Sequence, residues 1–292
     1  MIIQTKSGKT NYVKSGWLKL AVPCWVWKNP FNPFYDDGND KKMLYWSLRT
    51  VDDTIREADK LFETGDYLEV YQLLNRIKFR ENVDVLWRVS RSLYKMAQDE
   101  TNSNNIKREM IDEAYEIITS TLSRGANNPN VHKWMALIVN FKTNLEGTTS
   151  KAKNLGVIKK HMKKAVELNP YDVFVLHMLG QLCYNLSNLN RFERFLASYL
   201  FENPPPSSYE EAYEYLSKAE SIRPGFYIPN LYLLGKTCYR MQKYFRANYY
   251  LKMATSLPPR SSYEVQCAKR AKTLVQNLSE FDISRDALVT DI

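Results

Sequence analysis

The clearest hydrophobic pattern of the chain lies between residues 230 and 259. Apolar side chains recur there at intervals of three and four residues, the spacing that aligns them on one face of a helix. A short polar break divides the pattern into two runs, and Pro258 and Pro259 end the second run because proline cannot continue a helix. The pattern predicts two helices folded back on each other. Their apolar positions are Leu231, Leu234, Cys238, Ala247, Leu251 and Ala254.

Small and large residues alternate within this pair. Gly235 and Ala247 stand where the two helix axes must come close, while Tyr244 and Leu251 fill the space between the helices. This alternation resembles a tetratricopeptide repeat, a helix-turn-helix unit of roughly 34 residues. One such unit cannot bury its own apolar face, so further units are expected beside it.

Four more helix pairs and a closing helix follow from the same pattern. A polar insert at 98–105 delays the second helix of the second pair, and a loop at 146–153 is expected in the third pair. The helical stretches are 52–77 for the first pair, 83–96 and 107–122 for the second, 134–141 and 157–170 for the third, 173–186 and 209–224 for the fourth, and 261–278 for the closing helix.

An internal duplication is visible in two of these pairs. The segment LGQLCY begins at Leu179 and the segment LGKTCY begins at Leu234, 55 residues later. This distance exceeds one repeat of roughly 34 residues, which predicts an additional helix between them. The amphipathic segment at 191–201, followed by three prolines, fits that helix.

The predicted fold is all-α: a right-handed helical solenoid of about five irregular tetratricopeptide-like repeats with a C-terminal capping helix. Only 10 glycines occur in 292 residues, and long alternating β-branched runs are missing, as expected for helices. Three regions are predicted: an aromatic and basic N-terminal arm at 1–50, poorly ordered; the repeat domain at 51–280; and a frayed tail at 281–292.

The N-terminal arm does not follow the helical period. It mixes tryptophans such as Trp17, Trp25 and Trp27 with lysines and turn-forming residues. Tryptophan next to lysine suits a membrane headgroup boundary or a protein partner. The simpler interpretation, favoured because disorder concentrates at chain termini, is a flexible leader whose aromatic side chains pack loosely.

The formal charge is +9 and the isoelectric point about 9.2, which favours anionic partners. Residues 1–50 contribute eight Lys and Arg against three Asp and Glu, so the helical body is only mildly basic. A strong nucleic-acid-binding field over the whole body is not expected, and no nucleic-acid partner is predicted.

Residue patterns that carry catalysis or bind metals are missing from the sequence. The three histidines do not stand at metal-ligand spacing, and no glycine-rich phosphate loop or catalytic Ser or His motif occurs. The four cysteines lie far apart, which is typical of a reducing compartment. The longest apolar stretch, 17–27, is about half of a membrane span. We predict a cytoplasmic protein without catalytic residues, metal, cofactor or transmembrane segment.

Solenoids of this kind present the first helices of their repeats on a concave groove. Cations, aromatic rings and thioethers at the groove positions would suit an acidic, extended peptide, since the cations pair with carboxylates. Val89, Ala136, Val139 and Phe174 lie near the same surface and would instead suit an acyl chain. The predicted groove residues are Arg88, Lys95, His132, Met135, Lys142, His177, Met178, Gln181, Tyr184, Lys236, Tyr239 and Arg240.

A second basic feature is a lysine stripe in the third pair. Lysines four residues apart align on one face of a helix and repel each other unless an anion lies opposite. The stripe would dock on an acidic tail or a phosphate; a solvated outer face is the alternative. Its members are Lys159, Lys160, Lys163 and Lys164.

Between residues 52 and 278 the chain resembles the regulator of microtubule dynamics family. The resemblance rests on the order of the segments LWRVSRSLY, IKKHMKKAVELNPYD, LGQLCYNLSNL, NPPPSSYEEAYEYLSKAESIRPGF and LGKTCYRM. It implies a tetratricopeptide-like domain that associates with microtubules, the spindle and spindle poles. One branch of this family is membrane-anchored, tethers organelles and is linked to lipid binding. Residues 1–50 do not resemble the spanning helix of that branch, so organelle tethering is not the expected role.

The leading hypothesis is a non-enzymatic microtubule-associated scaffold or adaptor that binds acidic partners such as tubulin tails. The alternative is a lipid-binding or lipid-transfer helical-repeat protein at organelle contacts, so acidic peptides and phospholipid are further partners to consider. A peptide-binding co-chaperone ranks lower because the Asn and Lys residues of the first helices do not form the paired arrangement of a carboxylate clamp.

Overall fold

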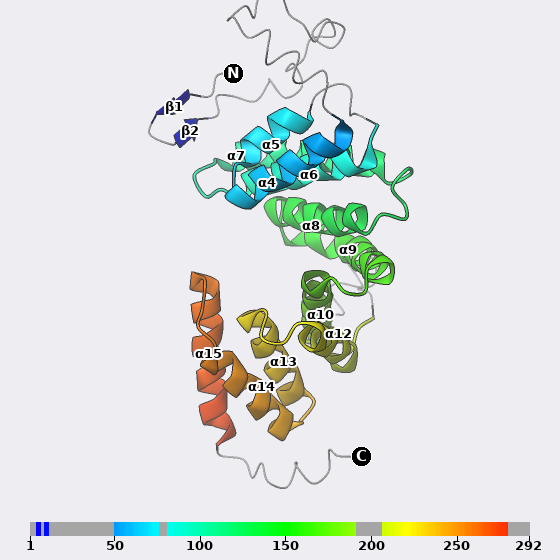
Figure 1. Cartoon of the computed structure of the whole chain (residues 1–292). Coiled ribbons are helices and arrows are strands. Elements are labelled where there is room, and N and C mark those ends of the chain that lie inside the picture. Colours follow the sequence, from blue (N-terminus) through cyan, green and yellow to red (C-terminus); the bar gives the residue numbers. More distant parts are fainter. Residues whose placement is uncertain (1–3, 7–8, 12–49, 76–80, 191–205, 280–292) are drawn as a thin grey trace, which may run out of the picture. The chain divides into compact units, whose positions relative to one another are not determined.

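The computed structural model describes residues 4–6, 9–11, 50–75, 81–190 and 206–279. Apart from two short strands, these residues form helices and the turns that join them, which confirms the predicted all-α class (Figure 1). The strands β1 (Gln4–Lys6) and β2 (Lys9–Asn11) pair antiparallel. The chain divides into two compact units, residues 1–148 and residues 149–292.

In the first unit, consecutive helices pack on one another from α4 to α8. Ala58, Ile111 and Ala114 are fully buried, so the small and branched residues at repeat positions form its core. The helices are α4 (Val51–Thr64), α5 (Tyr67–Leu74), α6 (Val83–Ala97), α7 (Asn104–Thr121) and α8 (Pro129–Glu146).

Local sequence signals set the ends of these helices. Thr50 and Asp53 form a capping box that begins α4, and Gly65 ends it in the left-handed region at a φ of 89°. The side chains of Asn82 and Ser103 cap α6 and α7 by accepting from backbone N–H groups that have no partner within the helix. Gly65 therefore marks the turn between α4 and α5.

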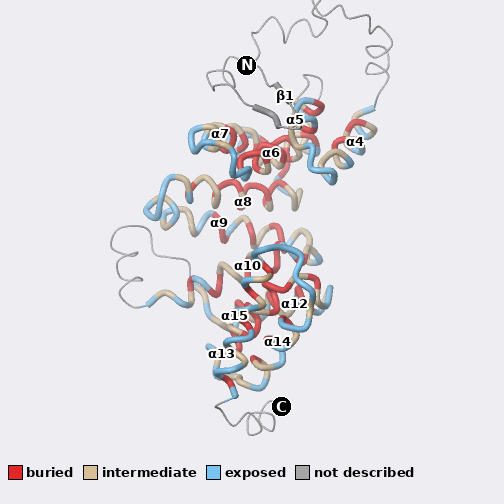
Figure 2. Tube along the Cα trace, turned by 90° about the vertical axis from the view of Figure 1, so that its left-hand side faces the viewer, coloured by how far each residue is buried: buried red, intermediate tan, exposed pale blue. Residues whose placement is uncertain are grey.

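In the second unit, α12 packs on α10 and α13, and α13, α14 and α15 pack on one another. Figure 2 shows buried and exposed stretches alternating along the helices, as expected for amphipathic helices that bury one side. The helices are α9 (Thr148–Leu168), α10 (Val173–Ser187), α12 (Tyr209–Ile222), α13 (Ile228–Arg240), α14 (Tyr244–Ser256) and α15 (Ser262–Leu278).

Two glycines explain the internal duplication. A Cβ atom on Gly180 would lie 2.6 Å from Leu216 Cγ, and a Cβ atom on Gly235 would lie 2.5 Å from Leu251 Cγ. Each glycine therefore lets its helix approach the following helix of the pair, α10 toward α12 and α13 toward α14. The close approach that the sequence predicts at Gly235 is confirmed.

Two features differ from the sequence analysis or lie outside the described residues. The loop expected at 146–153 is wrong: only Gly147, at a φ of 107°, separates α8 from α9, and the polar residues after it are helical. One glycine in the left-handed region is enough to redirect the chain, so no longer loop is needed. The additional helix predicted at 191–201 lies outside the described residues, as do most of the N-terminal arm and the tail.

Candidate partner-binding face

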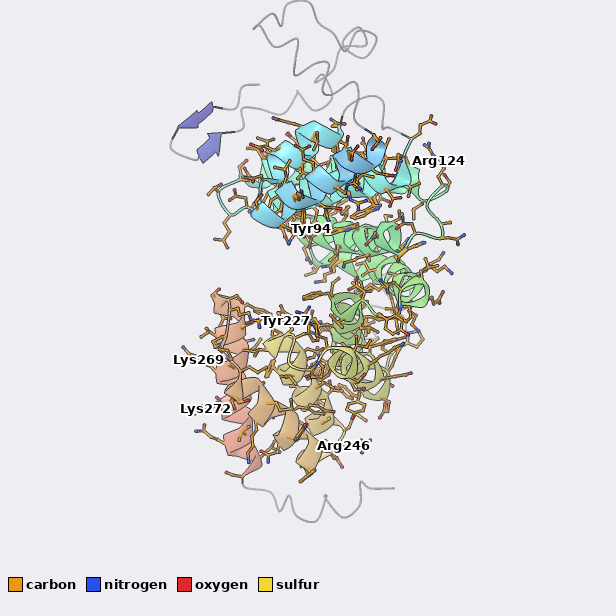
Figure 3. All side chains as sticks on the ribbon, viewed as in Figure 1. Tyr94, Arg124, Tyr227, Arg246, Lys269 and Lys272 are labelled. Atoms are coloured by element: carbon orange, nitrogen blue, oxygen red, sulfur yellow. The ribbon has the colours of Figure 1, made fainter. Side chains whose placement is uncertain are left out.

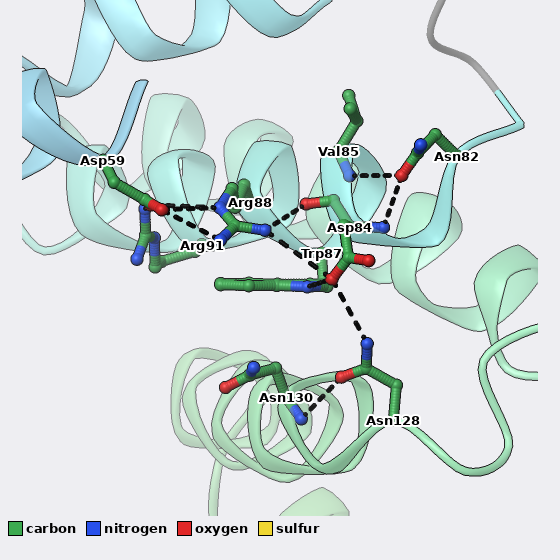
Figure 4. A network of polar contacts seen from close by, with 9 residues as sticks. All are labelled: Asp59, Asn82, Asp84, Val85, Trp87, Arg88, Arg91, Asn128 and Asn130. Carbon is green, nitrogen blue, oxygen red and sulfur yellow. Dashed lines mark hydrogen bonds and ion pairs between the residues drawn. The ribbon is translucent and has the colours of Figure 1, made fainter. Parts of the chain in front are cut away.

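Arg88, a predicted groove residue of the first unit, is held by internal contacts. Its Nη2 atom lies 2.8 Å from Oδ2 of Asp59, and its guanidinium lies 4.1 Å from the ring centre of Trp87 (Figure 4). Arg91 binds the same carboxylate at 2.7 Å. One aspartate of α4 therefore engages two arginines of α6, and these hydrogen bonds outweigh the effect of burial and lower the pKa of Asp59.

The same network joins α6 to the beginning of α8. The Trp87 indole Nε1 donates to Oδ1 of Asp84 at 3.0 Å, and Nδ2 of Asn128, the residue that caps α8, donates to the same oxygen at 3.4 Å (Figure 4). Arg88 also lies 3.7 Å from this carboxylate, so two carboxylates, those of Asp59 and Asp84, balance the positive charge of Arg88. The network connects three helices of the first unit.

The other predicted groove residues of the first unit are also buried or in contact with residues of the same unit. Lys142 forms ion pairs with Asp112 and, at 3.1 Å, with Glu146. Nε2 of His132 lies 2.9 Å from the carbonyl oxygen of Ala126, so this histidine has a structural contact. Met135 is buried and Lys95 half-buried, and burial lowers the pKa of Lys95. Val89, Ala136 and Val139, expected near a lipid channel, are core residues.

The lysine stripe does not form one continuous surface. Lys159 is buried, and its Nζ atom donates to Glu211 Oε2 at 2.8 Å and to the carbonyl oxygen of Pro206 at 2.6 Å. Lys163 binds the second oxygen of Glu211 at 2.9 Å. The anion that the lysine spacing requires is therefore Glu211 of α12. Lys164 pairs with Glu167 at 3.1 Å, and Lys160 is exposed.

His177, another predicted groove residue, belongs to a buried polar network of the second unit. Its Nδ1 atom lies 3.0 Å from Oδ1 of Asn230, whose Nδ2 atom donates to Oε2 of Glu220 at 3.2 Å. The other oxygen of Glu220 accepts from the Gly225 N–H at 2.6 Å. Burial lowers the pKa of His177 to about 4, so the ring is neutral at physiological pH. This residue joins α10 to α13.

The remaining predicted residues of the second unit come together with tyrosines. The Lys236 ammonium lies 4.9 Å from the ring centre of Tyr184 and 5.8 Å from that of Tyr232. Tyr209 contacts Tyr184 with ring centres 5.5 Å apart. The exposed Arg240 lies beside these rings: its polar contact with the Tyr184 hydroxyl, followed by the nearby Tyr209 and Tyr239, raises its pKa. Met178 is half-buried on α10.

The closing helix α15 adds residues that the sequence analysis missed. Burial raises the pKa of Tyr232, and the nearby Arg270 opposes this shift. Gln181 of α10 lies in polar contact with Tyr263. The signal was available, because α15 carries three cations in four positions, but the sequence analysis assigns this segment only the role of a capping helix. We define the tyrosine–cation face as Tyr184, Tyr209, Tyr232, Lys236, Tyr239, Arg240, Tyr263 and Arg270.

The charge that α13–α15 bring to this face has one sign at the surface. Residues 226–279 contain nine Lys and Arg and one carboxylate, that of Glu264. Glu264 is 6% exposed and its Oε2 accepts from the Arg260 N–H at 2.6 Å, so it contributes little to the surface. Figure 3 shows Lys269 and Lys272 pointing outward from α15, away from α13 and α14. The cations are Lys236, Arg240, Lys243, Arg246, Lys252, Arg260, Lys269, Arg270 and Lys272.

Two other kinds of site were sought in the described ranges. No group of three or more His, Cys, Asp or Glu residues there is arranged to hold a metal ion. None of the described helices combines the length and the apolar character that crossing a membrane demands. Cys183, Cys238 and Cys267 are buried free thiols, and burial raises the pKa of each. The predicted apolar position of Cys238 is confirmed, and Cys183 is equally buried.

The fold is that of a tetratricopeptide-like helical-repeat protein. A thermophilic TPR protein of Thermus thermophilus, solved by crystallography, matches with a TM-score of 0.51 and 15% sequence identity, over 76% of this chain and 98% of that chain. At this identity the likeness concerns the fold alone.

A model of the family described as "Regulator of microtubule dynamics protein 1-3" matches residues 54–279. Regulator of microtubule dynamics protein 1 of Bos taurus is 34% identical over 230 residues, 79% of this chain and 73% of the relative. The protein of the same name from Mus musculus is 35% identical over 228 residues, 78% of this chain and 75% of the relative. The chain therefore belongs to the family of regulators of microtubule dynamics.

Proposed function

We propose that this protein is a non-enzymatic helical-repeat scaffold that associates with microtubules through the basic surface of its second unit. The observation that supports this proposal is the positive charge of residues 226–279, where the one carboxylate, Glu264, is buried and hydrogen-bonded. Relatives in its family are named as regulators of microtubule dynamics. The acidic, flexible tails on microtubule surfaces are the complementary partner.

The attraction in this proposal is electrostatic and acts over a distance set by salt. Exposed charges are screened beyond about 8 Å at physiological ionic strength, so binding weakens steeply as salt rises. Cations that already pair with carboxylates contribute less, because binding a tail first requires the existing pair to break. The proposal therefore concerns α13–α15 and excludes the paired Arg88 and Lys142.

Co-sedimentation with taxol-stabilised microtubules across a salt series tests the proposal. Replacing Lys236, Arg240 and Arg270 by Glu is expected to lower the affinity at least about tenfold. Tail-cleaved microtubules should bind the unaltered chain with a similar loss. The matched control replaces the exposed first-unit cations Arg56, Lys60 and Arg124 by Glu, which changes the net charge equally. Equal losses in both triple variants would show that net charge, rather than the second-unit surface, drives association.

The lysine stripe on α9 is a separate candidate surface, tested through the exposed Lys160 and through Lys164, which pairs with Glu167 on its own helix. Lys159 and Lys163 bind Glu211, so their charge reversal disturbs the packing of α9 on α12 as well as any partner. Pelleting of a Lys160→Glu, Lys164→Glu variant tests the stripe with less structural disturbance. Unchanged pelleting removes it from the binding surface.

The proposal extends to a location on cytoplasmic microtubules, the spindle and spindle poles, which fluorescence microscopy of the tagged chain in dividing cells tests. A diffuse signal through mitosis would contradict it. The lipid-binding alternative gains no support from Val89, Ala136 and Val139, which pack in the core.

A further inference from the structure

The starting observation is the hydroxyl group of Tyr184. The side chain is 2% exposed, and its hydroxyl has no acceptor among the described residues, although the Arg240 guanidinium, which can only donate, lies beside it. Buried polar groups almost always have a partner, because leaving one unsatisfied costs free energy. The Tyr184 hydroxyl is therefore an enclosed donor without an acceptor, and an acceptor from outside reaches it only when a neighbouring side chain moves aside.

The surroundings of this hydroxyl specify the charge of that acceptor. The Lys236 ammonium is 4.9 Å from the ring centre of Tyr184, and the Arg240 guanidinium lies beside the same side chain. Neither cation forms an ion pair with a described residue. The Tyr184 hydroxyl is a neutral hydrogen-bond donor, and two cations lie beside the same side chain. The acceptor should therefore be an anion. Ring faces on Tyr209 and Tyr232 add apolar walls.

The spread of the cations favours a carboxylate on a chain over one compact polyanion. The face continues from α10 and α13 to α15, where Arg270 lies near Tyr232 and Tyr263. A series of separate cations matches a series of single negative charges, and side chains of an extended peptide follow one another at about 3.3 Å per residue. Arginine binds carboxylates through parallel N–H donors, and a phenol donates to a carboxylate in a short, strong hydrogen bond.

We propose that Tyr184, Lys236 and Arg240 form a carboxylate-binding subsite for one acidic side chain of an extended peptide, with Arg270 receiving a further carboxylate along the same face. This proposal rests on the proposed function, because it names the subsite at which an acidic partner docks. Because the Tyr184 hydroxyl is enclosed and the exposed Arg240 lies beside it, Arg240 would pair with the carboxylate and move aside, which lets the carboxylate reach the hydroxyl.

A Tyr184→Phe variant of the full chain gives the sharpest test. Fluorescence anisotropy with a fluorescein-labelled octaglutamate peptide measures binding, and an octaglutamine peptide is the uncharged control. We expect about tenfold weaker octaglutamate binding, the usual effect of losing one hydrogen bond to a charged group. The thermal midpoint should stay equal or rise, because the variant removes an unsatisfied buried hydroxyl. The matched control is Tyr249→Phe, which alters an exposed tyrosine of α14.

Lys236→Met provides a second variant that keeps the apolar stem and removes the charge. It should weaken octaglutamate binding about tenfold, whereas Lys272→Met on the outward side of α15 should weaken it less than about twofold. Equal losses in the two lysine variants, or unaltered binding by Tyr184→Phe, would overturn the subsite. Displacement of octaglutamate by millimolar inorganic phosphate, with no displacement by glutamate, would also overturn it and assign the site to phosphate.

The outcomes separate the subsite from the proposed function. Salt-sensitive pelleting with microtubules that Tyr184→Phe leaves unchanged would retain the function and reject the subsite. Octaglutamate binding that depends on Tyr184 without any pelleting would retain the subsite and reject microtubules as its partner. A chain shortened after Ser279 that binds octaglutamate when the full chain does not would assign the face to the acidic residues at 280–292 instead of an external peptide.

Discussion

Residues 51–148 carry thirteen Lys and Arg against sixteen Asp and Glu, whereas residues 149–279 carry nineteen against nine. The cations on the first helices of the repeats also have different partners in the two units. In the first unit Arg88 and Arg91 share Asp59, and Lys142 pairs with Asp112 and Glu146. In the second unit Lys236 lies against tyrosine rings, and Arg240 is in polar contact with Tyr184. Cations on corresponding first helices of a repeat therefore serve stability in one unit and remain available for a partner in the other.

The neighbouring helix decides between these two outcomes. A carboxylate such as Asp59 neutralises the cation opposite and holds its side chain in one geometry. A tyrosine ring attracts an ammonium or guanidinium by roughly 0.5–1 kcal/mol at exposed sites but leaves its charge unneutralised. The presence of a cation on a helix therefore does not identify a binding surface. The side chains that the neighbouring helix places opposite that cation do.

Asp59→Ala is expected to have the largest effect. It leaves Arg88 and Arg91, whose side chains are 14% and 12% exposed, without their shared carboxylate. Breaking a buried ion pair costs about 3–5 kcal/mol, and partial exposure of Asp59 lowers the expected loss to about 2–3 kcal/mol. Hydrogen exchange should show this loss in peptides of α4–α8 alone. Faster exchange in the second unit as well would contradict the independence of the two units.

The pH dependence of stability should have opposite slopes in the two units. Burial lowers the pKa of His177 to about 4, so between pH 6.5 and 4 an unfolded histidine binds a proton that the folded one does not. The second unit should lose up to about 3 kcal/mol as the pH falls through this window. Burial raises the pKa of Glu113 in the first unit to about 7, so the folded state holds the proton between pH 4.5 and 7. Its contribution is complete below pH 4.5 and is lost as the pH rises to 7.

Hydrogen exchange at pH values from 4.5 to 7, corrected for the intrinsic exchange rate, measures both slopes. His177→Gln should flatten the slope of the second unit, and Glu113→Gln should flatten that of the first. Slopes of the same sign in the unaltered protein, or slopes that survive these substitutions, would show that other groups control the pH response.

Gly235→Ala should destabilise the second unit by about 1–3 kcal/mol, because the added Cβ would lie 2.5 Å from Leu251 Cγ and 3.1 Å from the Ala247 carbonyl oxygen. Gly156→Ala on α9 is the control: no atom lies within 4 Å of its added Cβ, and alanine favours a helix. Chemical denaturation measures both. A Gly235→Ala protein as stable as the unaltered one would show that Leu251 can move aside.

The smallest changes in stability are expected when one lysine of each unit is replaced. Lys142→Met should destabilise the protein by about 1 kcal/mol because it breaks two ion pairs, and should leave acidic-peptide binding unchanged. Lys236→Met should change stability by less than about 0.5 kcal/mol and weaken peptide binding. Thermal denaturation and anisotropy on the same samples measure both properties. A reversal of the two patterns would remove the distinction between the units.

Much of the fold follows from the sequence because it depends on local signals. The three- and four-residue periodicity predicts the helices, and Gly65 and the residues that cap α6 and α7 mark ends of helices. The duplicated glycines at 180 and 235 predict which helices approach closely, since a glycine at a fixed repeat position has few other uses there. The loop at 146–153 fails because polar residues after a single glycine are compatible with either a loop or a helix.

Only the tertiary structure separates the structural cations from the available ones. Sequence periodicity assigns Arg88, Lys142, Lys236 and Arg240 to the groove side of their helices. It gives the same result for all four because it considers each helix without its neighbours. Whether a carboxylate lies opposite depends on residues 29 to 52 positions away in the chain, such as Asp59 for Arg88 or Glu211 for Lys159. Tyr184 gives the clearest case. Its place on a helix follows from the sequence, but its unsatisfied hydroxyl exists only because α10, α12 and α13 enclose it without an acceptor.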